Sequence, residues 1–98
     1  MQNKQKCYIS GKITGIEKEA FDKFEEAEIR LSLMGYEVVN PMKLPHDHDK
    51  DWHSFMREDI RAMTDCNVIY MLKGWHDSKG SIIEHEIAVS IGLDVKYQ

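Results

Sequence analysis

Cysteines, long apolar runs and an excess of positive charge are all missing or scarce in this 98-residue sequence, and each excludes a class of protein. The two cysteines, Cys7 and Cys66, lie in or beside apolar runs, so we expect buried, reduced thiols and no disulfide framework. No run approaches the ~18 apolar residues of a membrane span. The N-terminal stretch Met1–Lys6 lacks the apolar core of a signal peptide. We therefore expect a soluble, cytoplasmic protein that does not contact membranes.

Lysine and arginine are outnumbered by aspartate and glutamate, 13 to 17, which gives a formal net charge of -4. Contacts to a phosphate backbone need clustered Lys and Arg, so we do not expect a nucleic-acid polymer as partner. A single nucleotide stays compatible, because backbone amides at a helix start can hold one phosphate. The chain is 42% hydrophobic and 31% charged and is long enough for one core, so residues 1–98 are assigned to one globular domain.

Short apolar runs alternate with helical patterns along the chain. Such alternation predicts a parallel sheet with right-handed crossovers. We expect a three-layer α/β sandwich whose small, mainly parallel sheet has about four strands, as in flavodoxin-like and Rossmann-like folds; the strand order stays open. Ligands bind beyond the carboxyl ends of the strands in such sheets. The predicted strands span residues 7–10, 36–39, 67–72 and 93–97.

Apolar residues at steps of three and four predict three helices. The first begins at Thr14, which has the spacing of a capping box with Glu17, and its apolar stripe runs to Met34 before Gly35 ends it. The second begins near Trp52. The apolar positions of the third helix, and the glycine that stops it, are Ile83, Ile87, Ile91 and Gly92.

Two strand-to-helix junctions meet at the expected ligand edge. In the loop Ser10–Gly15, glycines let the backbone approach a ligand and a helix start attracts an anion, although a tight turn alone explains the loop equally well. At the second junction, Ser78, Gly80 and Ser81 are suited to a phosphate or a sugar hydroxyl. Glu84 follows, either as the capping-box partner of an N-cap Ser81 or as a catalytic carboxylate that faces the rim.

Asp59 lies on the second helix among charged neighbours. Either Asp59 belongs to a solvated helix face with local ion pairs, or Asp59 and Glu84 form the pair of carboxylates that glycoside chemistry requires. Trp52 and Trp75 flank the rim and either stack on a base or anchor the loops.

A polar loop raises the question of a metal. His46, Asp47, His48 and Asp49 are followed by further His and Asp residues, and imidazole with carboxylate suits zinc or manganese. These residues lie in one short segment with no second cluster to support them, and such loops are ordinarily solvated. We therefore expect no metal and no cofactor.

Two sequence motifs, taken together with their order along the chain, resemble those of a known family. Tyr8–Gly15 resembles the opening strand and loop of nucleoside 2-deoxyribosyltransferases and the related 2'-deoxynucleoside 5'-phosphate N-hydrolases. Gly80–Ala88 is similar to their signature, in which a glycine precedes the helix that bears the nucleophile. The likeness covers nearly the whole chain and is greatest for small bacterial and phage proteins grouped with that superfamily.

The resemblance implies roles for individual residues. Glu84 matches the nucleophile that attacks the anomeric carbon, Tyr8 matches the tyrosine that positions it, and Asp59 matches a proton donor beside the leaving base. The loop containing Ser78 and Gly80 matches the segment that receives the 5' end. The residues assigned to substrate binding are Ser10, Gly11, Lys12, Ile13, Thr14, Ser78, Gly80 and Ser81.

The activity implied is that of an N-glycoside hydrolase or transferase that cleaves the base–sugar bond of a (deoxy)nucleoside or nucleotide. The partner is then a small-molecule nucleoside or nucleotide, and the resemblance implies a homo-oligomer, a dimer or larger. The alternative is a catalytically inactive nucleotide-binding or sensing module, which Glu86 and Asn67 favour because both depart from the family pattern. A third possibility is an interaction protein whose sheet edge or helices bind a macromolecule.

Overall fold

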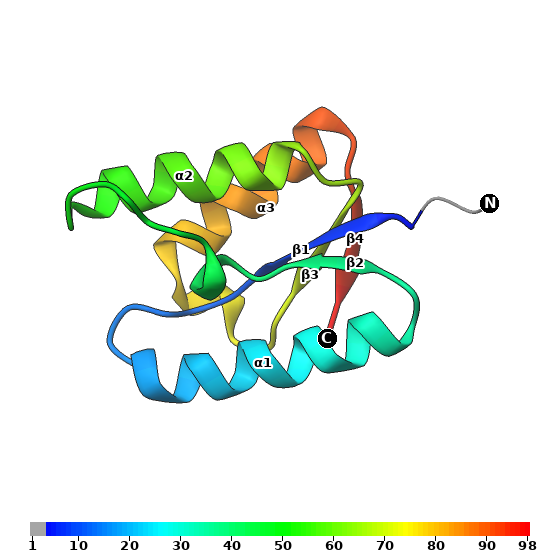
Figure 1. The fold of residues 1–98 in the computed structure, drawn as a ribbon. Helices are drawn as coiled ribbons and strands as arrows, with labels where there is room; N and C mark the ends of the chain where they lie inside the picture. Colours follow the sequence, from blue (N-terminus) through cyan, green and yellow to red (C-terminus); the bar gives the residue numbers. More distant parts are fainter. Residues whose placement is uncertain (1–3) are drawn as a thin grey trace.

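The computed structural model describes residues 4–98, in which a fully parallel sheet lies between helices (Figure 1). Four strands pair in the order β2-β1-β3-β4. This confirms the expected three-layer α/β sandwich and matches the first four positions of the flavodoxin-like order 2-1-3-4-5, whose switch point lies between β1 and β3. The strands are β1 (Lys6–Ser10), β2 (Glu37–Val39), β3 (Val68–Met71) and β4 (Asp94–Tyr97).

The helices cover the two faces unequally. Helix α1 (Glu17–Leu33) lies on one face, and α2 (Trp52–Thr64) and α3 (Lys79–Ile91) lie together on the other (Figure 1). Single-turn 3-10 helices, η1 (Pro41–Lys43) and η2 (Trp75–Asp77), follow β2 and β3. All three α-helices begin on the same side of the molecule, on the left in Figure 1, where the site is built.

Alternation along β1 distributes its side chains between two cores. Successive residues of a strand point to opposite faces of the sheet. Cys7 and Ile9 therefore pack with α1, around Phe24, while Tyr8 packs toward α2 and α3. Ser10 has the same parity as Tyr8, so both hydroxyls face the layer that contains α3.

Both cysteines are buried free thiols in the part of the chain that the structure describes, as expected. Burial raises the pKa of Cys7 to about 12 and that of Cys66 to about 11, so both stay protonated at neutral pH. Within residues 4–98, no helix combines the length and apolar character needed to cross a membrane.

The predicted start of the first helix is wrong. Thr14 does not cap α1; Ile16 occupies the N-cap position and makes no side-chain capping bond. A turn closed by the Ile16 amide and the Ile13 carbonyl at 3.0 Å, with Gly15 at φ +87°, delays the helix until Glu17. Met34, placed on the apolar stripe by its spacing, is the C-cap and is 66% exposed.

The predicted cap of α3 is wrong as well. Ser78 is the N-cap: its hydroxyl accepts a hydrogen bond from the Ser81 amide at 3.2 Å. The helix therefore begins at Lys79, and Ser81 lies within its first turn. The buried face consists of Ser81, Glu84 and Ala88, while Ile91 is exposed. Glu84 is thus not a capping residue, and its carboxylate is available for another role.

Candidate active site

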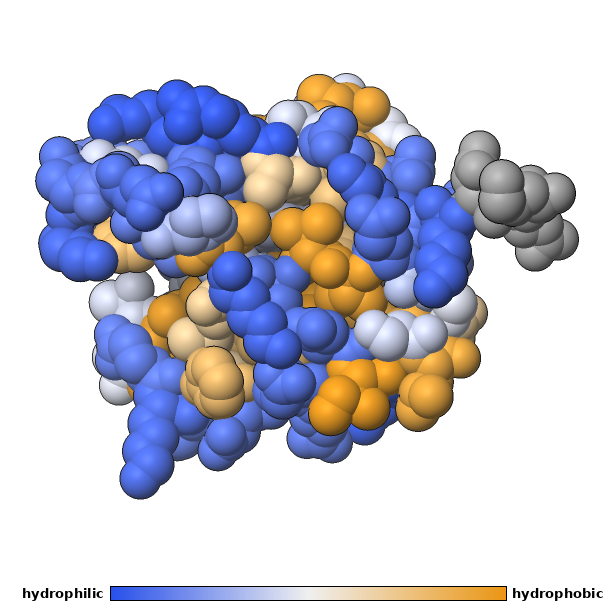
Figure 2. Space-filling model, viewed as in Figure 1, coloured by the Kyte–Doolittle hydropathy of each residue, from blue (hydrophilic) through white to orange (hydrophobic). Residues whose placement is uncertain are grey.

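A cavity of about 570 Å³ opens beyond the carboxyl ends of the strands, between the first turns of the helices. Its position beside β1 and β3 is the switch point at which ligands bind in such sheets. Figure 2 shows the molecule hollowed at this edge, between the start of α1 and the loop before α2. Every residue that the sequence analysis assigned to the site lies in the lining: Tyr8, Ser10, Gly11, Lys12, Ile13, Thr14, Asp59, Ser78, Gly80, Ser81 and Glu84.

Glu84 is held at both carboxylate oxygens by β1. The Ser10 hydroxyl donates to Oε1 at 2.6 Å, and the Tyr8 hydroxyl donates to Oε2 at 2.9 Å. Because Tyr8 and Ser10 are two residues apart on one strand, their side chains leave the same face of the sheet and reach one helical residue. Glu84 is only 5% exposed, so its carboxylate has a fixed position on the cavity wall.

Asp59 is the second buried carboxyl of the cavity. It lies on α2, is 9% exposed, and its Oδ1 has no hydrogen-bond partner among residues 4–98. Burial, then the charges of Glu84 and Glu58, raise the pKa of Asp59 to about 8. Without a donor to stabilise its charged form, Asp59 is protonated at neutral pH.

The two carboxyls differ in their surroundings. Burial raises the pKa of Glu84 to about 7, and the hydrogen bonds from Ser10 and Tyr8 act in the opposite direction by favouring the charged form. At neutral pH Asp59 is therefore mostly protonated, whereas Glu84 is divided between its neutral and ionised forms, and the two hydrogen bonds favour the ionised one. A neutral acid and a fixed carboxylate in one cavity can perform acid-assisted nucleophilic chemistry.

The start of α3 forms the polar end of the cavity. The hydroxyl of Ser81 is buried there and has no partner among residues 4–98, and a helix N-terminus favours an anion. Two cations line the same cavity, Lys12 and Lys79. The Lys79 ammonium lies 4.7 Å from the centroid of the Trp52 ring. Gly80 lets α3 approach α2, because a Cβ there would lie 2.9 Å from the Met56 sulfur.

A family model described as a domain of unknown function (DUF4406) matches residues 5–97. The chain belongs to this family. No curated protein matches the chain. The matched region of this DUF4406 domain contains every residue of the cavity lining.

The two tryptophans of this DUF4406 domain have different roles. Trp52 lines the cavity. Trp75 does not, because its ring stacks between His76 and His85 at centroid distances of 3.9 and 4.4 Å.

Several lining residues were not predicted. Phe55 and Met56 carry the 3.6-residue periodicity of α2, which predicts core and gives no sign of a ligand contact. Lys79 was missed although it lies between two assigned residues, Ser78 and Gly80. The remaining lining residues that were not assigned to the site are Ile9, Glu17, Phe24, Pro41, Met42, His46 and Asp77.

Glu86 and Asn67, which depart from the pattern of the nucleoside 2-deoxyribosyltransferases that the sequence resembles, lie away from the cavity. Glu86 is exposed on α3 and does not line the cavity. Asn67 precedes β3, and its side-chain oxygen accepts a hydrogen bond from the Lys6 amide at 3.1 Å, at the opposite end of the sheet. Neither residue changes the charge of the cavity wall, so neither argues against turnover.

Proposed function

We propose that this protein is an N-glycoside hydrolase or transferase that cleaves the base–sugar bond of a (deoxy)nucleoside or nucleotide. The observation that carries the proposal is the carboxyl pair: two hydroxyl donors fix Glu84 and favour its ionised form, while Asp59, which lines the same cavity, keeps most of its proton at neutral pH. Glycoside cleavage uses two carboxyl groups with these two different protonation states.

The first chemical step follows from these positions. A Glu84 oxygen attacks the anomeric carbon as the bond from that carbon to the base nitrogen breaks, and Asp59 donates its proton to the departing base. The sugar is then held as an ester of Glu84. In the second step, ionised Asp59 removes a proton from water, or from an incoming base, as that molecule attacks the anomeric carbon and releases Glu84.

The remainder of the cavity is suited to the rest of such a substrate. A volume of about 570 Å³ lies within the usual range of small-molecule sites. The first turn of α3, with Ser81 and the nearby Lys79, suits the 5' end, whether hydroxyl or phosphate. The apolar side chains of Trp52, Phe55 and Met56 offer a surface for the base.

Release of free base tests the proposal. The protein is incubated with pooled nucleosides and their 5'-monophosphates, and free bases are separated by chromatography. We expect release by the wild type and none by Glu84→Gln, which keeps the shape of the side chain but not its charge. Glu86→Gln is the matched control: it removes an exposed carboxylate from the same helix and should leave release unchanged.

The possible results separate the proposal from its alternative. Equal release by wild type and Glu84→Gln would contradict the role of Glu84. No release from either, together with a rise in melting temperature when a nucleotide is added, would replace the enzyme by a nucleotide-binding module.

A further inference from the structure

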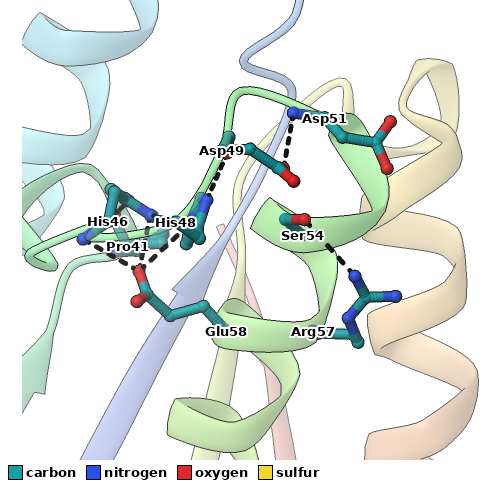
Figure 3. A network of polar contacts seen from close by, with 8 residues as sticks. All are labelled: Pro41, His46, His48, Asp49, Asp51, Ser54, Arg57 and Glu58. Carbon is teal, nitrogen blue, oxygen red and sulfur yellow. Dashed lines mark hydrogen bonds and ion pairs between the residues drawn. The ribbon is translucent and has the colours of Figure 1, made fainter.

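A second polar cluster lies beside the cavity, where the loop before α2 meets that helix (Figure 3). It consists of His46, His48 and Glu58, all partly buried. His46 Nδ1 lies 2.6 Å from Glu58 Oε1 and 3.1 Å from His48 Nε2. His48 Nε2 lies 3.6 Å from Glu58 Oε1. His46 Nδ1, His48 Nε2 and Glu58 Oε1 therefore converge on one point. These two ring nitrogens are the inner nitrogens, and the other nitrogen of each ring is the outer one.

The outer nitrogens of both imidazoles face backbone carbonyls. His46 Nε2 lies 2.7 Å from the Pro41 oxygen, and His48 Nδ1 lies 2.6 Å from the Asp49 oxygen (Figure 3). A carbonyl oxygen only accepts hydrogen bonds, so each outer nitrogen is the one that carries hydrogen and donates. In neutral imidazoles the inner nitrogens then present lone pairs. Two lone pairs and a carboxylate oxygen repel one another unless a positive charge, either a metal ion or an added proton, lies between them.

We propose that His46 Nδ1, His48 Nε2 and Glu58 Oε1 bind a divalent first-row transition metal ion of the zinc type. Imidazole nitrogen and carboxylate oxygen are ligands that Zn²⁺ accepts, at ~2.0–2.2 Å, and tetrahedral geometry then places ligand atoms about 3.3 Å apart. The separations of 3.1 and 3.6 Å are close to that value, whereas the 2.6 Å between His46 Nδ1 and Glu58 Oε1 is a hydrogen-bond distance that must lengthen when an ion enters. The two carbonyls that fix the outer nitrogens are the kind of partner that orients histidine ligands in metal sites.

The surroundings hold the two imidazoles in place. Phe55 packs against both rings, with centroid distances of 4.9 Å to His46 and 4.5 Å to His48. The His46 amide donates to Glu58 Oε1 at 3.1 Å. Across residues 4–98, His46 is the sole non-glycine residue with positive φ, at 50°, a conformation that the surrounding contacts maintain.

The proposed site differs from the expectation of no metal that was drawn from the loop sequence. Spacing placed the histidines in one segment without support, whereas the third ligand comes from α2, next to Asp59 in the chain. A metal here ties the loop to α2, and because His46 and Phe55 also line the cavity, it fixes that part of the wall. The inference does not depend on the role of Glu84.

Titration calorimetry of the metal-free protein with Zn²⁺ alone tests the proposal, and Co²⁺ absorption reports the ligand geometry. We expect saturable binding of one ion. Because loss of a partner outside the coordination sphere weakens metal sites about 10–100-fold, removing a ligand should weaken binding at least 100-fold in His48→Asn and in Glu58→Gln. His53→Asn is the control, since His53 is exposed, lies at the start of α2, and contacts Asp51 and the Trp52 ring but none of the three proposed ligands. It should bind as the wild type does.

Each other result overturns the proposal. Absence of saturable binding would mean that the three side chains share only a proton. Equal affinity in wild type, His48→Asn and Glu58→Gln would place the ion elsewhere. Each variant guards against loss of local structure in the other: Glu58→Gln keeps an acceptor for the His46 amide, and His48→Asn leaves Glu58 intact. Glu84→Gln should bind Zn²⁺ normally, so failure of the proposed activity leaves this test valid.

Discussion

At the scale of the residue, the Tyr8 hydroxyl favours the negative charge of Glu84. The side chain is almost fully buried, and burial raises its own pKa well above the usual range, so it is a permanent donor. Together with Ser10 it stabilises the ionised form of Glu84 in a site where burial alone favours the neutral form.

Replacement of Tyr8 by Phe removes this donor while preserving the ring. The pKa of Glu84, about 7 in the wild type, should then rise further. A hydrogen bond to a charged group is worth about 1.5–3 kcal/mol, and a pKa difference of one corresponds to about 1.4 kcal/mol, so we expect the pKa to rise by about one or more. Carbon-13 NMR titration of the Glu84 carboxyl measures it. Tyr97→Phe, which removes an exposed hydroxyl bonded to His85, should leave this titration unchanged. An unchanged pKa in Tyr8→Phe would contradict the account.

Sequence alone identified both carboxyls but not their properties. Glu84 and Asp59 were found through a motif and a helical position. Their protonation states depend on burial created by β1, α2 and α3 together, and on the absence of a donor for Asp59 Oδ1 within residues 4–98. No spacing along the chain encodes such a difference, because it is set by tertiary packing.

The elements themselves were largely predictable, whereas their first turns were not. Strand–helix alternation and apolar periodicity place all the strands and α-helices, since burial of one face determines both. The caps failed because several candidates compete locally. At α3, Ser78 and Ser81 are both good N-cap residues, and only the path of the chain after η2 decides between them.

The corrected cap of α3 is open to a direct test. Ser78→Ala should lower the free energy of unfolding by about 1 kcal/mol, because the Ser81 amide loses its acceptor. Ser81→Ala should cost less, since its hydroxyl makes no hydrogen bond within residues 4–98. Urea denaturation of both variants measures the difference. A larger loss in Ser81→Ala than in Ser78→Ala would restore the cap predicted from sequence.

At the scale of the whole molecule, the strand order brings together segments that are far apart in the sequence. The order β2-β1-β3-β4, which sequence left open, places the loop after β1 next to the segment after β3 and so assembles one cavity from both junctions. The cluster of His46, His48 and Glu58 likewise exists only through the contact of a loop with α2. The homo-oligomer stays a prediction.

The carboxyl pair also gives the whole molecule a particular dependence on pH. The pKa values of Asp59 and Glu84 rise from ordinary values of 3.8 and 4.5 in the unfolded chain to about 8 and about 7. Between pH 5 and pH 8 these two carboxyls thus hold more protons in the folded protein than in the unfolded chain. The free energy of unfolding must then fall as pH rises through this range. For either carboxyl, a folded-state pKa that is higher by one than the unfolded-state pKa corresponds to about 1.4 kcal/mol.

The most direct test of the central claim, that burial raises the pKa values of both cavity carboxyls, needs no substrate. It is the free energy of unfolding, measured by urea denaturation from pH 4 to pH 9, for the wild type and for the double variant Asp59→Asn/Glu84→Gln. We predict that the wild type loses at least about 1.4 kcal/mol relative to the double variant between pH 5 and pH 8. Parallel curves for the two proteins would show that both carboxyls titrate as they do in water, and would contradict the account.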